Sequence, residues 1–567
     1  MYRPTEDDLL VLRERAGQFG QQLQRHRQGR LSEDEFRPLR LQNGLYLQRH
    51  APMLRVAIAY GMLRSDQLRC LAEVADRFDR GYGHLTIRQN MQLNWIEVDQ
   101  VPAALAMLAE VGLHGIQTSG NCLRNITSDA FAGIAPEEIL DPRPYAELLR
   151  QWSTFHPELS FLPRKFKVAI TGTPEDRALA QVHDLAFEVV DAQPEAVFRV
   201  RVGGGLGRTP VLGPVVRERL SWRHMLAYTH AIMRVYNELG RRDNLNKARI
   251  KILVRTAGIE AFRAMVEEEF EHLHARAIDR IGPDDLARVA RGFVEPDWSR
   301  AARATGEPVH PVAAPKPRFA RWLQRNRHAH RVPGMAAIAI PVKGLGRPPG
   351  DLKSEEMRWL ADLADRFSQG YLRVTHAQDL VLPAVPERDL VEVYDALDGY
   401  GLADPVYGLV GDMVACPGGD YCALANARSL PIAEEISRRY ADLNAQEHLG
   451  PVDLRISGCM NSCGHHHIGH IGILGVDKDG SAYYQLLLGG HSGHGSQAAL
   501  GRIVGRAFAE DEVPDAVEAI LEQYLALRNE GEVFHHTLRR LGHGPFVEAA
   551  NAVRRPAALA AGAGDRA

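Results

Sequence analysis

The sequence predicts a mixed α+β protein built from two copies of one unit that are related by a pseudo-twofold axis. Sliding the chain against itself by 289 residues lays residues 71–93 over 360–382 without a gap, and 11 of the 23 aligned positions are identical. Each copy shows an apolar helical pattern, a Gly-Tyr turn and then alternating polar and apolar residues. The 567 residues exceed what one core can organise, so we expect three or four domains.

The elements of the two copies follow in the same order along the chain. The first copy begins with a helix over LAEVADRF, turns at Gly81 and Tyr82, and continues as a strand. The second repeats this with LADLADRF, Gly370 and Tyr371. Between the copies, a segment rich in Pro, Ala and Arg predicts a linker over 301–333. A twofold interface between such units is a natural place for a shared cofactor.

Composition excludes several classes of function. With 68 basic and 71 acidic residues the net charge is −3, so no global field favours nucleic acid or a membrane surface as a partner. No apolar run approaches the length of a transmembrane helix. The N-terminal MYRPTEDDLL carries acids where a signal peptide needs basic residues, so we expect a cytoplasmic protein.

Four of the six cysteines form two close pairs among glycines. Cys416 and Cys422 are separated by five residues, and Cys459 and Cys463 by three. Disulfides, a structural zinc and an iron-sulfur cluster are the three interpretations. A reducing cytosol disfavours disulfides, and structural zinc sites usually separate paired cysteines by two to four residues. Four thiolates around a 4Fe-4S cluster fit the pattern best, and zinc stays open.

The basic residues of interest come mainly from the first copy and the segment after it. Arg88 stands where the second copy has Ala377, whereas the four cysteines occur only after the second copy. Short motifs also hold Arg55, Arg124, Lys165, Lys167 and Arg249. Each alone is typical of a solvated surface charge. Directed together into one cavity, they would bind a polyanion or a small oxyanion.

With these motifs the chain resembles the sirohaem-containing sulfite and nitrite reductases. The resemblance rests on the cysteine spacing, TIRQ at 86–89, LPRKFK at 162–167 and VGGGL at 202–206, and extends from about residue 45 to 540. It implies a three-domain, pseudo-twofold fold with a ferredoxin-like central domain and two flanking α/β domains. The implied boundaries are 45–117 and 334–400 for the ferredoxin-like halves, and 118–300 and 401–550 for the α/β domains. The low complexity of the C-terminal sequence predicts a disordered tail over 551–567.

The resemblance also implies roles for individual residues. Cys416, Cys422, Cys459 and Cys463 would hold a 4Fe-4S cluster, and Cys463 would also ligate the sirohaem iron. Arg55, Arg124, Lys165 and Lys167 match the substrate cage. Arg88, Gln92, Arg249, Gln378 and Asn461 match positions near the sirohaem. One departure is His470, which stands where the family usually has an acid.

The implied activity is the six-electron reduction of sulfite to sulfide in assimilatory sulfur metabolism. Nitrite reductases of the family often carry Asn at the position of Lys167, so the lysine favours sulfite, with nitrite reduction as the alternative. No flavin or NADPH fold is evident in the sequence. A separate electron donor is therefore expected, either an NADPH-dependent flavoprotein or a ferredoxin.

Overall fold

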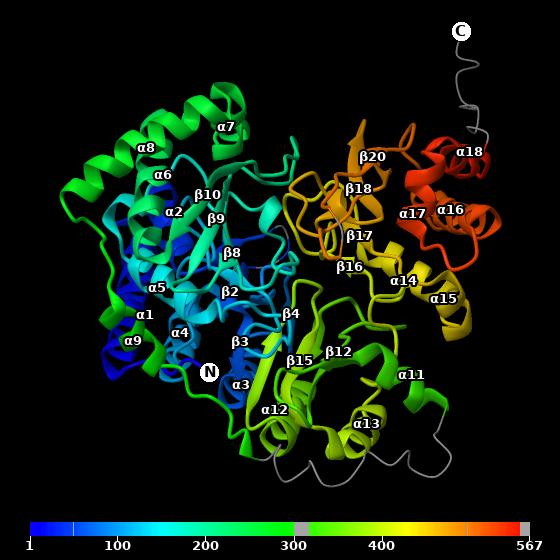
Figure 1. Cartoon of the computed structure of the whole chain (residues 1–567), viewed down its shortest axis with the longest axis horizontal. Helices are drawn as coiled ribbons and strands as arrows, with labels where there is room; N and C mark the ends of the chain where they lie inside the picture. Colours follow the sequence, from blue (N-terminus) through cyan, green and yellow to red (C-terminus); the bar gives the residue numbers. More distant parts are fainter. Residues whose placement is uncertain (49, 51, 300–316, 496, 556–567) are drawn as a thin grey trace.

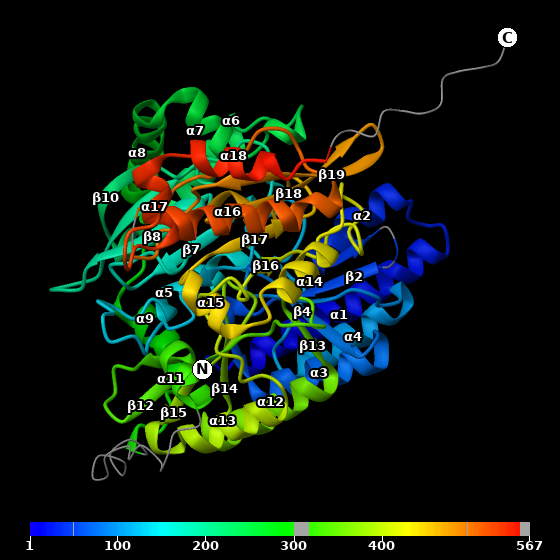
Figure 2. The same cartoon turned by 90° about the vertical axis from the view of Figure 1, so that its right-hand side faces the viewer.

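The computed structural model describes residues 1–48, 50, 52–299, 317–495 and 497–555, and its strands form four five-stranded sheets. Figure 1 shows one α/β lobe at the upper left, with β8–β10 and α6–α8, and a second at the upper right, with β16–β20 and α16–α18. The duplicated units lie below them, where α3 and α12 pack against each other (Figures 1 and 2).

The two duplicated units repeat each other element by element. Helix α3 (Ser65–Phe78) lies 289 residues before α12 (Ser354–Phe367), β4 (Tyr82–Leu85) before β14 (Tyr371–Val374), and α4 (Val101–Glu110) before α13 (Leu390–Gly399). Helices α3 and α12 form because their apolar residues recur at helical spacing, and these faces are buried against one core. The predicted fold class, a pseudo-twofold duplicated α+β centre flanked by α/β domains, is confirmed.

The two units exchange a strand. The first sheet has the order β1-β2-β5-β4-β13 and the second β11-β12-β15-β14-β3. Strand β13 (Asp351–Lys353) belongs to the second unit and pairs with β4, while β3 (Met62–Arg64) belongs to the first and pairs with β14. The other strands are β1 (Leu45–Leu47), β2 (Pro52–Val56), β5 (Met91–Leu93), β11 (Arg327–Ala329), β12 (Met335–Ile340) and β15 (Leu380–Pro386).

The two α/β lobes share one topology. The first sheet runs β6 (Thr127–Ser128), β7 (Val168–Thr171), β8 (Leu185–Asp191), β9 (Val197–Val202) and β10 (Val215–Ser221). The second runs β16 (Val414–Ala415), β17 (Leu454–Ser457), β18 (Ile471–Lys478), β19 (Ser481–Leu488) and β20 (Arg502–Ile503). In each, the first three strands are parallel and the last two antiparallel. The duplication therefore includes the lobes, which sequence comparison did not reveal.

Helices cover these sheets and the N-terminal part of the first unit. They are α1 (Glu6–Arg27), α2 (Glu33–Gln42), α5 (Arg143–Thr154), α6 (Met225–Leu239), α7 (Ile250–Ala257), α8 (Ile259–Ala275), α9 (Pro283–Arg291), α11 (Pro317–Asn326), α14 (Leu430–Arg439), α15 (Leu443–Leu449), α16 (Val513–Leu527), α17 (Phe534–Leu541) and α18 (Gly544–Ala552). Among the described residues, no helix is both long and apolar enough to cross a membrane.

Two predicted boundaries need correction. The predicted linker 301–333 is wrong in its described part, because α11 and β11 lie there and Trp322 is fully buried in the central core. Phe319, Trp322 and Leu323 make one apolar helical face that the Pro- and Arg-rich composition concealed. The predicted tail 551–567 is wrong for its first residues, since Arg554 stacks on Phe508 at 3.7 Å from the ring centroid. Residues 301–316 and 556–567 lie outside the described residues.

Candidate functional site

A row of polar side chains crosses the first sheet and brings Arg55 into position. Cross-strand registers pair Asp351 with His84, His84 with Gln92, and Gln92 with Arg55. The Nε of Arg55 donates to Oε1 of Gln92 at 3.1 Å, and His84 Nδ1 lies 2.7 Å from Asp351 Oδ1. Because paired residues share one face of a sheet, these groups lie side by side on it.

A short parallel bridge brings Arg124 beside Lys165 and Lys167. The N–H of Arg124 donates to the carbonyl of Phe166 at 2.7 Å, and the N–H of Phe166 donates to the carbonyl of Cys122 at 3.0 Å. Arg124 and Arg55 both donate to the carbonyl of Thr118, at 2.6 and 3.3 Å. Arg55 from the first sheet therefore lies close to Arg124 from the first α/β lobe.

Arg88 and Arg249 approach the same place and are held by consecutive residues. Nδ1 of His183 lies 2.6 Å from the carbonyl of Leu179, which makes it the protonated nitrogen, so Nε2 accepts a hydrogen bond from Arg88. Asp184 accepts both Nε and Nη2 of Arg249 at 2.8 Å. It also accepts the main-chain N–H of Lys167 at 2.9 Å.

The electrostatics of this cluster favour a bound anion. Burial lowers the pKa of Lys165 to about 7 and of Arg88 to about 9, and in both the nearby Arg124 adds to the shift. Burial, then the amine of Lys165, also lowers the pKa of Lys167. No hydrogen bond to either lysine amine is found in the described part of the chain. Cations that are partly buried, close together and short of carboxylates require negative charge from a ligand.

The four cysteines lie opposite these cations. Cys416 directly follows β16, and Cys459 and Cys463 lie in the loop after β17. Burial raises the pKa of the Cys416 thiol to about 12 and of the Cys459 thiol to about 11, and proximity to Cys463 adds to both shifts. Cys463 also acts electrostatically on Lys165, and Arg55 on Cys422. The thiols and the cations thus face one another.

The spacing of the thiols suits a cluster better than one zinc ion. All four are free, and in the described residues no three of the sulfurs lie within 4.8 Å of one another. Sulfurs that share a zinc ion at ~2.3 Å must all be closer than ~4.6 Å to one another. A polycarboxylate macrocycle beside the cations and an inorganic core among the thiols both fit the residues present.

Two predicted residues have contacts that tie them to the loops of the cysteines. Asn461 donates hydrogen bonds to the sulfur of Cys459 from its main chain and its side chain, which offsets part of the rise that burial causes in the pKa of that thiol. The Gln378 amide donates to the carbonyl of Ala415 at 2.9 Å and accepts the N–H of Ala415 at 3.0 Å. Gln378 is therefore fixed to the residue before Cys416, and its predicted cofactor contact stays a prediction.

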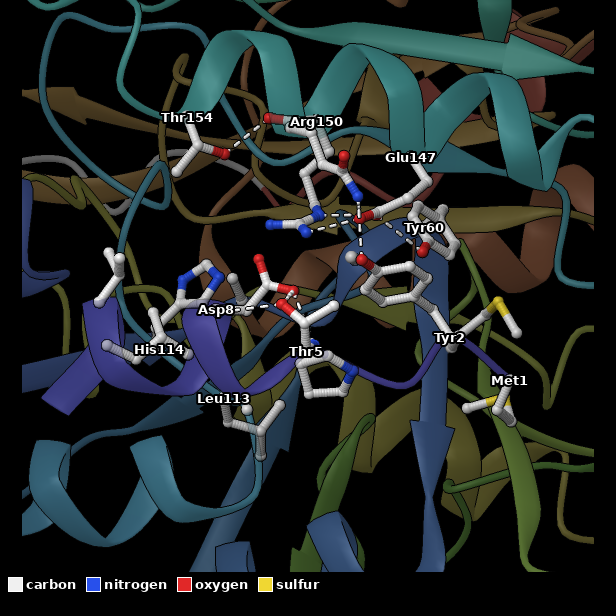
Figure 3. A pocket seen from close by; sticks show the side chains of 18 of the residues that line it. Met1, Tyr2, Thr5, Asp8, Tyr60, Leu113, His114, Glu147, Arg150 and Thr154 are labelled. Carbon is white, nitrogen blue, oxygen red and sulfur yellow. Dashed lines mark hydrogen bonds and ion pairs between the residues drawn. The ribbon is translucent and has the colours of Figure 1, made fainter. Parts of the chain in front are cut away.

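A separate cavity of about 350 Å³ lies near the chain start, between α1 and α5 (Figure 3). Its charged groups already satisfy one another. Glu147 accepts hydrogen bonds from Tyr60 at 3.0 Å and from Arg150 at 2.6 Å, and Asp8 accepts the N–H of Thr5 at 2.8 Å. Unlike the basic cluster, this cavity offers, among its described residues, no cations that require a bound anion, so we do not take it as the functional site.

His470 belongs to a group of three imidazoles with His491 and His535, whose ring nitrogens lie within 4.8 Å of one another. Nδ1 of His470 accepts the N–H of Asp453, and Nδ1 of His491 accepts the N–H of Gly493, both at 3.1 Å. The proton of each neutral ring therefore sits on Nε2, which makes that nitrogen a poor metal ligand. These hydrogen bonds explain the group without a metal.

Most of the chain matches two known protein families. The model of the nitrite and sulphite reductase 4Fe-4S domain matches residues 119–273 and 409–555, and that of the nitrite/sulfite reductase ferredoxin-like half domain matches 46–111 and 337–400. Sulfite reductase (ferredoxin) 2 of Mycolicibacterium paratuberculosis is 31% identical over 85% of this chain and 81% of its own. The chloroplastic ferredoxin–nitrite reductase of Zea mays is 29% identical over 85% of this chain and 80% of its own.

Solved structures agree with these matches. The structure of the Mycobacterium tuberculosis NirA protein superposes with a TM-score of 0.74 at 27% identity, covering 91% of this chain and 92% of that one.

Sequence reasoning missed His183 and Asp184. Both are buried and both hold predicted site residues. Asp184 directly precedes β8, just as His470 directly precedes the equivalent strand β18 of the second lobe. Recognising that the lobes are duplicated was the only signal that could have drawn attention to Asp184, because a lone Asp before an apolar strand otherwise resembles a turn residue.

Proposed function

We propose that this chain, which belongs to the nitrite and sulfite reductase family and uses the family's sirohaem and 4Fe-4S cluster, reduces sulfite to sulfide. The coupled cofactors supply electrons in succession and the position at which the anion binds. The observation that carries the proposal is the partly buried cluster of cations facing the four thiols, with Lys167 among them. An oxyanion with several negative oxygens is the ligand that such a cluster stabilises.

We assign the cofactor contacts residue by residue. Cys416, Cys422, Cys459 and Cys463 would hold the cluster, with Cys463 shared with the sirohaem iron. Arg88, Gln92, Arg249, Gln378 and Asn461 would surround the sirohaem, whose many carboxylates call for cationic and amide partners. Arg249 and Asn461 are already oriented, the first by Asp184 and the second beside Cys459.

The substrate cage would act through charge and proton supply. Arg55 and Arg124 would hold the oxygens of the anion through the N–H groups of their guanidinium ends. The pKa of Lys165 near 7 means that its amine exchanges protons readily at neutral pH. A bound anion would raise the pKa of both lysines, so that they carry protons to donate as the S–O bonds break.

The electron donor we propose is a ferredoxin, because relatives that match most of the chain are named for that donor. We also propose that the protein acts in the cytoplasm in assimilatory sulfur metabolism. Comparing reduced ferredoxin with an NADPH-dependent flavoprotein as the only electron source for sulfite turnover tests the donor. Turnover with the flavoprotein alone would reject the ferredoxin.

Lys167 is the residue that favours sulfite over nitrite. Substituting K167N and measuring kcat/KM for both anions tests this, with the exposed K247N as the matched control. We expect K167N to lose sulfite reduction by about tenfold or more while nitrite reduction changes little. Equal losses for both anions would show that Lys167 does not discriminate. Faster turnover of nitrite than of sulfite by the unaltered protein would make nitrite reduction the function.

A further inference from the structure

We propose that Asp184 is a positioning residue of the cation cluster, holding Arg249 and the Lys167 main chain in place and supplying the negative charge that the surrounding cations require. This inference rests on the proposed function, since it concerns the groups assigned to the anion and the cofactor. Nothing in the sequence motifs or in the family comparisons assigns a role to this residue.

The geometry connects Asp184 to three parts of the site at once. Its carboxylate receives Arg249 with two hydrogen bonds of 2.8 Å and the Lys167 N–H at 2.9 Å. Its own carbonyl accepts the N–H of Gly203 at 2.8 Å, which ties it to the glycine-rich loop. The side chain is fully buried. A carboxylate in this position fixes the direction of the Arg249 guanidinium, because the bidentate pair admits only one plane.

The charge of Asp184 offsets repulsion among the cations. Lys167 is faced by Lys165 from its own segment, Arg88 from the turn before β5, Arg249 from the start of α7, His183 and Asp184 from before β8, and His465 from the loop of the cysteines. Of these groups only Asp184 is negative. It raises the pKa of Lys167 and of Arg88, whereas the cations lower them. Removing it would leave every remaining charge repulsive.

The test removes the negative charge of residue 184 and keeps the shape of its side chain. D184N can still accept the Lys167 N–H, but it loses the negative charge. D141N is the matched control, because Asp141 pairs with the buried Arg143 elsewhere in the same lobe. For each holoenzyme we would measure sirohaem and iron content, the pH profile of sulfite turnover, and the pH dependence of the sulfite Kd from the sirohaem absorbance.

The expected result is a shift in the alkaline limb of both profiles. In D184N the Lys167 amine loses its proton at lower pH, so the limb moves down by about one pH unit. D141N keeps the profile of the unaltered protein. R249Q removes a neighbouring cation, so its limb should move in the opposite direction, to higher pH. A purely structural role for Asp184 would lower stability without moving either limb.

The outcomes separate this inference from the proposed function. An unaltered protein that holds both cofactors but reduces neither anion overturns the function. An active protein in which D184N keeps the parental limb, or in which R249Q moves it downward, overturns the role of Asp184. If D184N cannot be purified with its cofactors, the thermal unfolding of the cofactor-free proteins decides: parental stability without cofactor binding supports the positioning role, and a loss of stability that D141N does not share shows a purely structural role and rejects it.

Discussion

Replacing Gln378 with alanine should release the strand that carries Cys416. Gln378 forms two hydrogen bonds with Ala415, and alanine would leave the N–H and the carbonyl of Ala415 without partners inside the protein. Each buried group left without a hydrogen-bond partner costs about 1–3 kcal/mol, so the two together lower the stability by about 2–6 kcal/mol. Because Cys416 is the next residue, we also expect Q378A to lose iron and acid-labile sulfide.

The pseudo-twofold symmetry supplies a matched control for this experiment. Gln89, 289 residues earlier, makes the same pair of bonds to Ser128, at 2.9 and 3.1 Å. Q89A should lower the thermal unfolding temperature about as much as Q378A but leave the cluster intact, since the residue after Ser128 is Asp129. Iron and sulfide would be assayed together with unfolding curves. Equal loss of iron in both variants, or a Q378A protein as stable as the parent, would refute the reasoning.

Three further outcomes are expected. Lys165 has a pKa of about 7 in the absence of an anion, so its charge is present below this value and lost above it. We therefore expect kcat/KM for sulfite to fall as the pH rises through 7, and K165R, which stays charged, to move this fall to higher pH. A flat profile from pH 6 to 9 in the unaltered protein would contradict this. C459S should lose the cluster while C70S keeps it, because Cys70 lies in α3 against Met107. Equal iron content in the two variants would contradict this. W322A should lower the free energy of unfolding by about 3–5 kcal/mol, and the exposed Q324A should hardly change it. Denaturant unfolding measures both. Similar midpoints would mean that α11 does not contribute to the hydrophobic core.

The sequence predicted the parts of the fold that local pattern determines. The helices α3 and α12 and the turns at Gly81 and Gly370 were visible because periodicity and glycine act over a few residues. The exchange of β3 and β13 was not visible, since the choice of a strand's partner depends on contacts far apart in the chain. For α11, the prolines that precede the helix outweighed a short apolar face.

The site divides in the same way. The cysteines and the basic motifs stood out because their residue types and spacing are uncommon together. Asp184 did not, because what distinguishes it is its surroundings: a buried carboxylate is significant only once Arg249 and Lys167 are seen to contact it. The bonds that hold Gln378 were likewise inaccessible, since main-chain partners leave no trace in residue type.

The exchanged strands have a consequence for how such a site can arise. Two identical subunits joined in this way would present every side chain twice, so any cation placed on one side of the axis would recur on the other. When both copies lie in one chain, equivalent positions of the two copies can carry different residues. Arg88 stands opposite Ala377, and Asp184 precedes β8 where His470 precedes β18. The first half carries the clustered cations and the second half the four cysteines, and the exchanged strands hold the two halves together.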